Sequence, residues 1–304
     1  MGFGKAPVWL WPFALPIAVR GFYNGLRLAN PPRKPLAPDA RTQASASLAN
    51  LEDFEVTTSD GIAISGWYVP PRDGRVVILG VGGFTNRTQL IHEASLLTRR
   101  GLGIVLFDWR GTGGSGGERS DWGRREQLDL TAVIDFLAAR PEVRRIGAFG
   151  FSIAGNVVAM VGARDSRLAA VALHGAWTTN DEEFAYKGAK YGVLTAVPGV
   201  WAFRLRGLDL SGVRPIDVIG RISPRPLLIV TADQDFHTPL EMTRRLLAAA
   251  GEPKRLWVGV GNQHIPYPDD GSVSALRVQI GQQLVDFFDG ALREEQTAEP
   301  RRYG

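Results

Sequence analysis

The apolar positions of this chain fall into short runs that alternate with longer amphipathic segments. Segments with a helical period lie at residues 87–100, 121–140, 153–164, 239–250 and 273–289. Strands without a polar face are typical of a parallel sheet that is covered on both sides by helices. We therefore predict an α/β fold with a mostly parallel central sheet and helices on both faces. The apolar runs that form its strands are Val76–Val81, Gly103–Asp108, Ile146–Phe151, Ala169–Leu173, Pro226–Thr231 and Leu256–Val260.

A hairpin is expected before the first of these runs. Order is predicted to begin near Leu51, where two β-rich segments flank a turn at residues 59–61. The main domain is expected over residues 51–290, followed by a flexible polar tail at 291–304. About 50 residues separate the fourth and fifth apolar runs, and residues 177–212 among them are aromatic and apolar without a clear period. We expect this segment to be a cap over the carboxyl ends of the strands.

The charge of the chain is concentrated at its N-terminus. The 304 residues carry a net charge of +4, with six basic residues and one acidic residue in the first 50, so the remainder has a charge of about −1. Because the body has no basic stripe with interleaved aromatics, we expect no nucleic-acid partner. The chain has no cysteine, which excludes disulfides, thiolate metal sites and cysteine nucleophiles.

Residues 1–50 are expected to be a hydrophobic, basic arm and linker. The uncharged run at residues 6–19 has 14 residues and three prolines, whereas a transmembrane helix needs about 20 apolar residues. No small-x-small cleavage site for a signal peptidase follows. Residues 30–48 carry four prolines, which indicates a linker. Two interpretations of this arm stay open. It could contact a membrane surface through Trp9, Trp11 and Phe13, or it could pack on the domain or in a homodimer. The protein is accordingly expected to be cytoplasmic or membrane-associated.

The candidate nucleophile is Ser152. It lies in the motif Gly150-Phe151-Ser152-Ile153-Ala154, directly after an apolar strand and before a helical segment. A serine on such a sharp turn exposes its hydroxyl above the sheet, and its neighbours must be small because the backbones pass closely. Ala154 stands where the usual G-x-S-x-G pattern has glycine. A structural turn is the alternative interpretation of this motif.

A serine nucleophile needs a base, and the base needs an acid that orients it. In the chain order serine, acid, histidine, the base is expected after the last strand, where His264 is the histidine available. His92, His174 and His237 fit this order less well, although His174 ends a strand and is expected to line the pocket. Asp235 is the predicted acid, and Asp233 is the alternative.

The developing oxyanion needs backbone N–H donors. We expect one from Ile153, the residue after the nucleophile, and one from Phe84, which follows the tight turn at Gly82-Gly83. A phosphate-binding loop is the alternative. However, the turn at Gly82-Gly83 has neither the G-x-G-x-x-G spacing of a dinucleotide site nor the G-K-[ST] ending of an NTPase.

Taken together, these motifs resemble the α/β-hydrolase superfamily over about residues 51–290. The turn from Asp108 to Ser115 is similar to the family's D-x-R-G-x-G-x-S turn, which is structural. The hairpin ending in SGWYVPP resembles that of bacterial esterase- and peptidase-like members, which often have a hydrophobic N-terminal segment. Two positions depart from the pattern: Gly82 stands where members usually have histidine, and Ala232 replaces a common glycine before the acid.

The resemblance implies a serine hydrolase with the triad Ser152, Asp235 and His264, an acyl-enzyme intermediate, and no metal or organic cofactor. The apolar cap favours a carboxylic ester with a hydrophobic acyl or alkyl group. Thioester cleavage and peptide or amide cleavage by the same triad are alternatives, as is acyl transfer to an acceptor other than water. A non-catalytic binding protein that keeps the fold alone is the alternative of another class.

Overall fold

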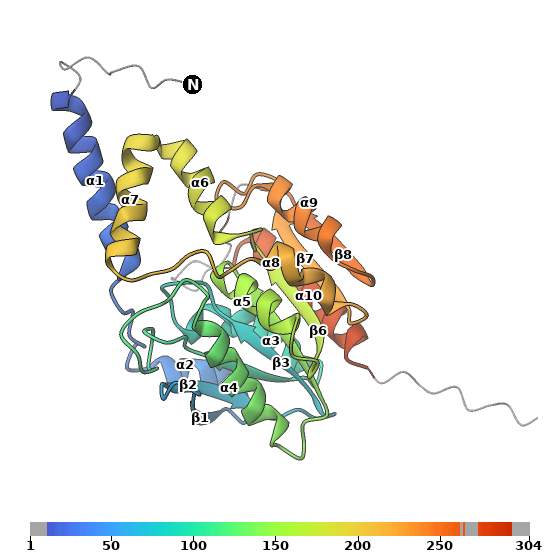
Figure 1. Cartoon of the computed structure of the whole chain (residues 1–304). Helices are drawn as coiled ribbons and strands as arrows, with labels where there is room; N and C mark the ends of the chain where they lie inside the picture. The colour runs from blue at the N-terminus through green and yellow to red at the C-terminus, as the bar shows by residue number, and fades with distance from the viewer. Residues whose placement is uncertain (1–10, 262–263, 265–272, 294–304) are drawn as a thin grey trace, which may run out of the picture.

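A single eight-stranded sheet forms the centre of the molecule (Figure 1). The computed structural model describes residues 11–261, 264 and 273–293. The strand order is β1-β2-β4-β3-β5-β6-β7-β8, and β2 alone runs against its two neighbours. The sheet is therefore mostly parallel, which confirms the predicted fold class. The strands are β1 (Glu52–Thr57), β2 (Ala63–Val69), β3 (Arg75–Gly80), β4 (Gly103–Phe107), β5 (Arg145–Phe151), β6 (Leu168–His174), β7 (Leu227–Ala232) and β8 (Lys254–Gly259).

Helices cover both faces of this sheet. α3 packs with α10 on one face, and α4, α5, α8 and α9 form a continuous layer on the other. The helices of the described residues are α1 (Trp11–Ala29), α2 (Ala40–Ser47), η2 (Arg87–Leu90), α3 (Ile91–Arg99), α4 (Glu126–Ala138), α5 (Ile153–Gly162), α6 (Asn180–Tyr191), α7 (Val193–Leu205), α8 (Pro215–Val218), η3 (Ile219–Ile222), α9 (Leu240–Ala249) and α10 (Ala275–Ala291).

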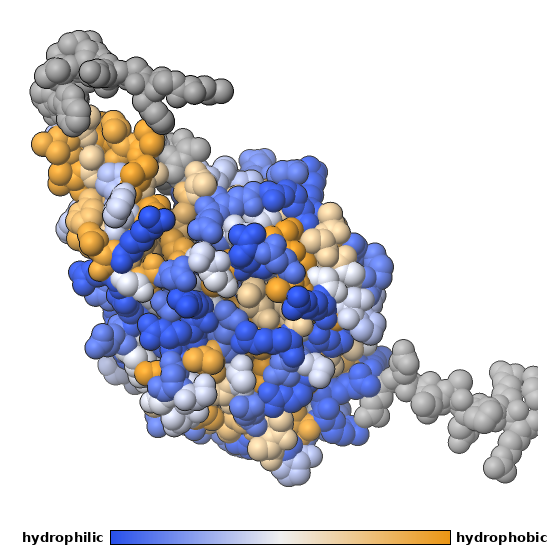
Figure 2. Space-filling model, viewed as in Figure 1, coloured by the Kyte–Doolittle hydropathy of each residue, from blue (hydrophilic) through white to orange (hydrophobic). Residues whose placement is uncertain are grey.

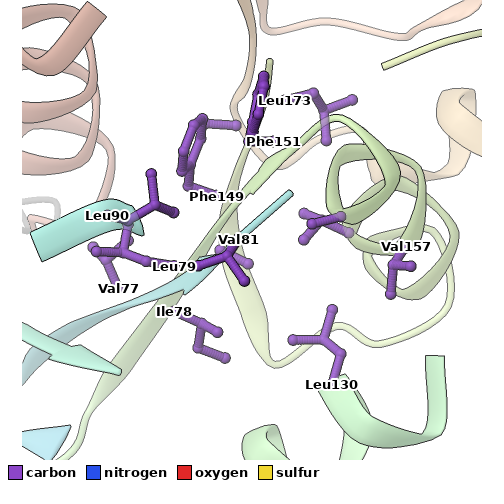
Figure 3. Close-up of a cluster of buried hydrophobic side chains, with 14 of the residues drawn as sticks. Val77, Ile78, Leu79, Val81, Leu90, Leu130, Phe149, Phe151, Val157 and Leu173 are labelled. Atoms are coloured by element: carbon purple, nitrogen blue, oxygen red, sulfur yellow. The ribbon is translucent and has the colours of Figure 1, made fainter. Parts of the chain in front are cut away.

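The core lies on both sides of the central strands. Val77 and Leu79 of β3 point towards Leu90, whereas Ile78 points towards Leu130 of α4 (Figure 3). All five side chains are fully buried. Because successive side chains of a strand face opposite sides, an unbroken apolar run is what a strand between two helical layers requires.

Two predictions about element boundaries were wrong. α2 begins at Ala40 inside the expected linker 30–48, so order begins well before Leu51. Ala40 and Ala44 lie one helical turn apart and are both buried, so packing stabilises this short helix. The helix predicted over 121–140 begins only at Glu126, because Trp122 and Gly123 before it both take positive φ values, of 53° and 91°.

The segment between β6 and β7 holds the helices α6 and α7, and α1 from the N-terminal arm lies along α7 (Figure 1). In the part of the chain that the structure describes, no helix combines the length and the apolar character that crossing a membrane requires. Trp9 and residues 294–304 of the expected tail lie outside the described residues.

Candidate active site

Ser152 occupies the turn between β5 and α5. Its φ of 58° and ψ of −124° lie in a region that residues other than glycine rarely adopt. The turn is held by the Ser152 amide, which donates to the His174 carbonyl at 2.8 Å. At Gly150 a Cβ atom would lie 2.2 Å from the Ala154 carbonyl oxygen, so this position requires glycine. The strained turn lifts the hydroxyl out of the sheet at the carboxyl end of β5.

The structure brings Ser152, His264 and Asp235 together from three loops. His264 Nε2 lies 3.2 Å from Ser152 Oγ, and His264 Nδ1 lies 2.8 Å from Asp235 Oδ2. The side chains of His264 and Asp235 are buried, so water competes little for these contacts. This geometry allows the serine to lose its proton to a histidine that a carboxylate holds in one tautomer.

The Asp235 carboxylate is held from both sides. Its Oδ1 atom accepts hydrogen bonds from the amides of His237 and Thr238 at 2.8 and 2.9 Å, in the turn before α9. Burial works to raise the pKa of Asp235. The hydrogen bond and charge of His264, together with the two amides, outweigh burial and keep this pKa below its usual value. The carboxylate is therefore ionised at neutral pH.

The other candidates from the sequence lie around this centre or away from it. Asp233 is exposed and accepts the Gly261 amide at 2.8 Å, as a turn-forming residue does. His237 lies beside His264, with ring centroids 4.7 Å apart. His174 is fully buried against Phe151. His92 lies on α3, away from the three residues.

The glycine turn after β3 packs against the loop that carries Ser152. A Cβ atom at Gly83 would lie 2.5 Å from Ile153 Cδ1, which shows how closely the two loops approach. Phe84, the next residue, has a φ of 65°. Within the described residues, the amides of Phe84 and Ile153 donate to no protein acceptor. Both predicted oxyanion donors therefore belong to loops that meet beside Ser152.

Side chains that the sequence did not single out hold this glycine turn. Gln89 Oε1 accepts the Gly82 amide at 2.9 Å, and Trp109 Nε1 donates to the Val81 carbonyl at 2.9 Å. Gln89 thus holds the turn at the position where this chain has Gly82 in place of the family's usual histidine. Its spacing of seven residues from Gly82 carries no motif that would have revealed it.

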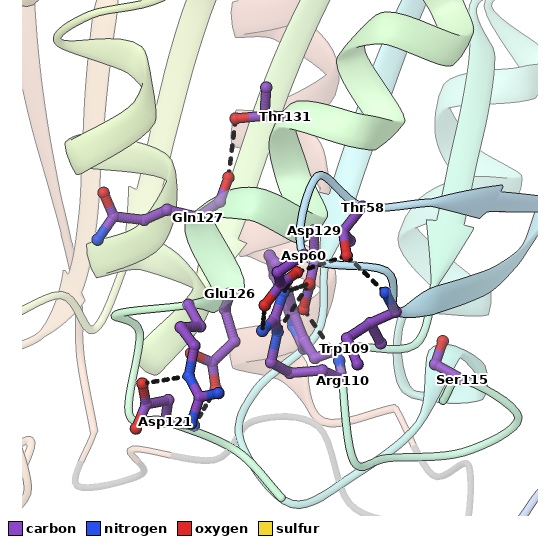
Figure 4. Close-up of polar contacts among 12 residues, drawn as sticks. Thr58, Asp60, Trp109, Arg110, Ser115, Asp121, Glu126, Gln127, Asp129 and Thr131 are labelled. Carbon is purple, nitrogen blue, oxygen red and sulfur yellow. Dashed lines mark hydrogen bonds and ion pairs between the residues drawn. The ribbon is translucent and has the colours of Figure 1, made fainter. Parts of the chain in front are cut away.

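The turn after β4 is a network of buried charges. Arg110 forms ion pairs with Asp129 of α4 and with Asp60 in the hairpin turn, both at 2.7 Å (Figure 4). Asp108 accepts from the Arg87 guanidinium at 2.8 Å and from the Gly114 amide at 2.8 Å. These contacts join the turn to three neighbouring elements, consistent with the structural role implied by the resemblance.

Aromatic side chains connect the glycine turn to the segment between β6 and β7. Phe84 packs edge-on against Trp122 at 5.3 Å between ring centroids. Trp122 in turn contacts Phe184 of α6 at 5.0 Å and Phe203 of α7 at 5.5 Å. The loop that carries Phe84 is therefore continuous with α6 and α7 through an apolar cluster.

Comparison with known proteins places this architecture in a family. The profile of the X-Pro dipeptidyl-peptidase (S15) family matches residues 36–199, which include Ser152 but neither Asp235 nor His264. An uncharacterized protein of Mycobacterium tuberculosis (strain H37Rv) is 32% identical over 73% of this chain and 75% of its own length. The chain belongs to the S15 family of α/β hydrolases. YfhR of Escherichia coli K12 is 29% identical over 81% of this chain and 83% of its own length.

Solved structures share the fold of this S15 member. An esterase of Pyrococcus furiosus has a TM-score of 0.71 at 21% identity, covering 86% of this chain and 97% of its own. The α/β hydrolase GrgF of Penicillium has a TM-score of 0.60 at 22% identity, covering 79% and 98%. Likeness at this identity establishes the α/β-hydrolase fold. Together with the S15 match, it supports hydrolase activity.

Proposed function

We propose that the protein is a serine hydrolase that cleaves a carboxylic ester with a hydrophobic acyl or alkyl group. The observation that carries this proposal is the contact chain from Ser152 Oγ through the His264 ring to Asp235, with distances of 3.2 and 2.8 Å. In hydrolases with this arrangement, a weak serine nucleophile is activated by the adjacent base.

The proposed reaction has two halves. Ser152 Oγ attacks the carbonyl carbon while His264 Nε2 takes its proton, and Asp235 stabilises the imidazolium that forms. The tetrahedral intermediate collapses with loss of the alcohol, which receives the proton from His264. In the second half, water attacks the acyl-enzyme while His264 Nε2 takes a proton from it. The new tetrahedral intermediate collapses, its bond to Ser152 Oγ breaks, and Ser152 regains the proton as the carboxylic acid leaves. The proposal requires no metal or organic cofactor.

Two backbone amides are proposed to hold the oxyanion. The close approach of Gly83 to the Ile153 side chain supports this role for Phe84 and Ile153, since it draws both amides to the side of Ser152. Loss of one such donor typically lowers kcat by about 100- to 1,000-fold. Gln89 would act on this site as a positioning residue, because its side chain accepts the amide of Gly82.

Apolar groups around the site favour an ester with a hydrophobic part. Phe84 belongs to the proposed oxyanion loop and packs on Trp122, and Phe184 and Phe203 continue the apolar cluster into α6 and α7. Burial of apolar substrate area at such side chains contributes about 25 cal/mol per Å². We expect substrates with longer acyl chains to have lower KM values until the pocket is filled.

The proposal is tested by covalent labelling with a fluorophosphonate, together with turnover of p-nitrophenyl esters of increasing chain length. The wild-type protein is expected to be labelled and to hydrolyse esters, while Ser152→Ala and His264→Ala are expected to lose both properties. Ser211→Ala, at an exposed serine, is the matched control. A folded wild-type protein that is neither labelled nor active on any acyl substrate contradicts the proposal and favours a non-catalytic binding protein.

Cleavage of a peptide bond by the same residues is the second candidate. The match of residues 36–199 to the X-Pro dipeptidyl-peptidase family favours it. The test is turnover of Xaa-Pro p-nitroanilides by the wild-type protein and by Ser152→Ala. A kcat/KM for these anilides above that for every p-nitrophenyl ester would replace the ester proposal. Thioesters assayed in the same series distinguish the remaining alternative.

A further inference from the structure

A large apolar surface covers the helix pair α1 and α7. Of the fifteen large hydrophobic side chains that are exposed among the described residues, ten belong to these two helices. Figure 2 shows their apolar side chains gathered where α1 and α7 extend from the body. Surfaces of this kind mark sites of interaction with proteins or membranes. The ten residues are Leu15, Ile17, Val19, Tyr23, Leu28, Val193, Leu194, Val197, Trp201 and Leu205.

Small residues pack the two helices together and leave these side chains outside. A Cβ atom at Gly21 would lie 2.4 Å from the Thr195 carbonyl oxygen, and one at Gly25 would lie 2.6 Å from that of Gly199. Backbones this close leave no space for large side chains between the helices. The apolar side chains of α1 and α7 therefore face solvent on the outer surface of the pair.

The charges on this surface have one sign. Arg20 and Arg27 on α1 and Arg204 on α7 are exposed, and neither helix contains an aspartate or a glutamate. Arg206 follows α7 directly, and the ten residues before α1 contribute Lys5 and no acid. Apolar side chains, an exposed tryptophan and arginines suit the interface of a membrane with anionic headgroups.

We propose that the outer surface of α1 and α7 docks on an anionic lipid bilayer, lying in its interface. Apolar side chains would enter the headgroup region while arginines contact the anionic headgroups. A second copy of the chain fits this surface less well. In a symmetric dimer both sides of the interface come from this same patch, so its arginines would be buried against a surface that offers no acid as a partner.

Docking would place α7, which belongs to the segment expected to form a cap, at the lipid surface. A groove of about 520 Å³ between α6 and α7 is lined by Phe184, Val200 and Trp201 among others. Phe203 of α7 packs on Trp122, which contacts Phe84 beside Ser152. If the chain is the ester hydrolase proposed above, a lipid-borne ester is the substrate class that this position favours. The docking itself does not depend on that activity.

The test is co-sedimentation of the full chain with vesicles of phosphatidylcholine, and with vesicles of an equimolar mixture with phosphatidylglycerol. We expect binding to the anionic vesicles that weakens with salt. The triple variant Arg20→Glu, Arg27→Glu, Arg204→Glu should lower the partition coefficient at least about tenfold. The matched control is the triple variant Arg100→Glu, Arg244→Glu, Arg255→Glu, at three exposed arginines that lie far from α1 and α7 along the chain.

A second variant tests the apolar part of the surface. Val197→Gln combined with Trp201→Gln should also weaken vesicle binding, and since both side chains are exposed, thermal unfolding should change little. Equal binding to both vesicle types, or no binding by the wild-type protein, overturns the proposal. So does a dimer in light scattering that the glutamine variant dissociates, because a second copy would then cover the surface.

Failure of docking and failure of the proposed hydrolase are separable. Ser152→Ala should bind vesicles as the wild-type protein does, since its side chain lies outside the surface. Fluorophosphonate labelling in the absence of lipid reports the serine alone. Labelling without vesicle binding would overturn docking and retain the hydrolase, and vesicle binding without labelling would do the reverse.

Discussion

Asp233 and Asp235 lie two residues apart after β7 and have different surroundings. Asp235 is buried, contacts His264 Nδ1 at 2.8 Å and accepts two amides, whereas Asp233 is exposed and caps a turn at Gly261. Only one of the two carboxylates can orient the histidine. At the scale of single residues, the proposed chemistry therefore depends on Asp235.

We predict that Asp235→Asn lowers kcat for ester hydrolysis by about 10³- to 10⁴-fold. The neutral amide removes the charge that stabilises the imidazolium and the acceptor that selects its tautomer. Asp233→Asn is the control and should change kcat by less than about threefold, because its side chain is exposed. Steady-state kinetics on one ester measure both values. A larger loss in Asp233→Asn would assign the acid to that residue.

A second prediction concerns His174, the buried histidine at the end of β6. Burial, aided by the charge of His264, lowers its pKa to about 3, whereas an unfolded histidine titrates near 6.5. The folded protein therefore holds this ring neutral, and the unfolded chain binds the proton first. Between about pH 6.5 and pH 3, acidification should therefore lower the contribution of His174 to the free energy of unfolding by up to about 1.4 kcal/mol per pH unit.

Urea unfolding of the wild-type protein and of His174→Phe at several pH values from 7.5 to 4.5 checks this prediction. The wild-type protein should lose more stability than the variant over this range. Asp235 does not interfere, since its lowered pKa places its effect at more acidic pH, where the ion pair is lost as pH falls. Parallel curves for the two proteins would refute a neutral His174.

At the scale of elements, Arg110 connects the turn after β4 to α4 and to the turn of the β1–β2 hairpin. Its partner Asp129 is completely buried. Burial raises the pKa of Asp129, and the charge of Arg110 opposes that shift. The carboxylate depends on this one arginine for its stabilisation among the described residues.

We predict that Arg110→Ala lowers the free energy of unfolding by about 3–5 kcal/mol, because it leaves a buried charge without a partner. Arg167→Ala is the control: this arginine also pairs with two aspartates, but it is exposed. Its loss should cost less than about 1 kcal/mol. Chemical denaturation measures both values. Equal losses would show that burial does not determine the contribution of Arg110.

At the scale of the whole molecule, the sheet with its two helical layers is joined to a peripheral pair, α1 and α7. The core residues of β3, β5 and β6 are buried without help from α1. The helix pair depends instead on backbone contact at Gly21 and Gly25. We therefore expect the pair to open without loss of the central fold.

The corresponding prediction uses Gly25→Leu, whose Cβ atom would lie 2.6 Å from the Gly199 carbonyl oxygen. The clash should separate α1 from α7 and raise the rate of tryptic cleavage within α1 at least about tenfold, while thermal unfolding of the body changes little. Asn24→Leu, at an exposed position of the same helix, is the control. Unfolding of the whole protein by Gly25→Leu would show that α1 belongs to the central fold.

The sequence alone determined the central fold and the three residues that the structure brings together. The ends of the parallel strands were predicted within one or two residues, because a short unbroken apolar run is typical of a strand that is buried on both faces. Ser152, Asp235 and His264 were found because each follows a strand, and the carboxyl ends of parallel strands meet at one edge.

Only the tertiary structure decided what surrounds these residues. The contact of Gln89 with the glycine turn, the complete burial of His174 and the contact of α1 with α7 arise between segments that no local pattern connects. α2, which lies inside the predicted linker, is stabilised by the burial of Ala40 and Ala44. The helix propensity of a short segment does not reveal such tertiary packing. Local spacing determines which side chains a strand presents, whereas their pKa values and partners depend on residues distant in the chain.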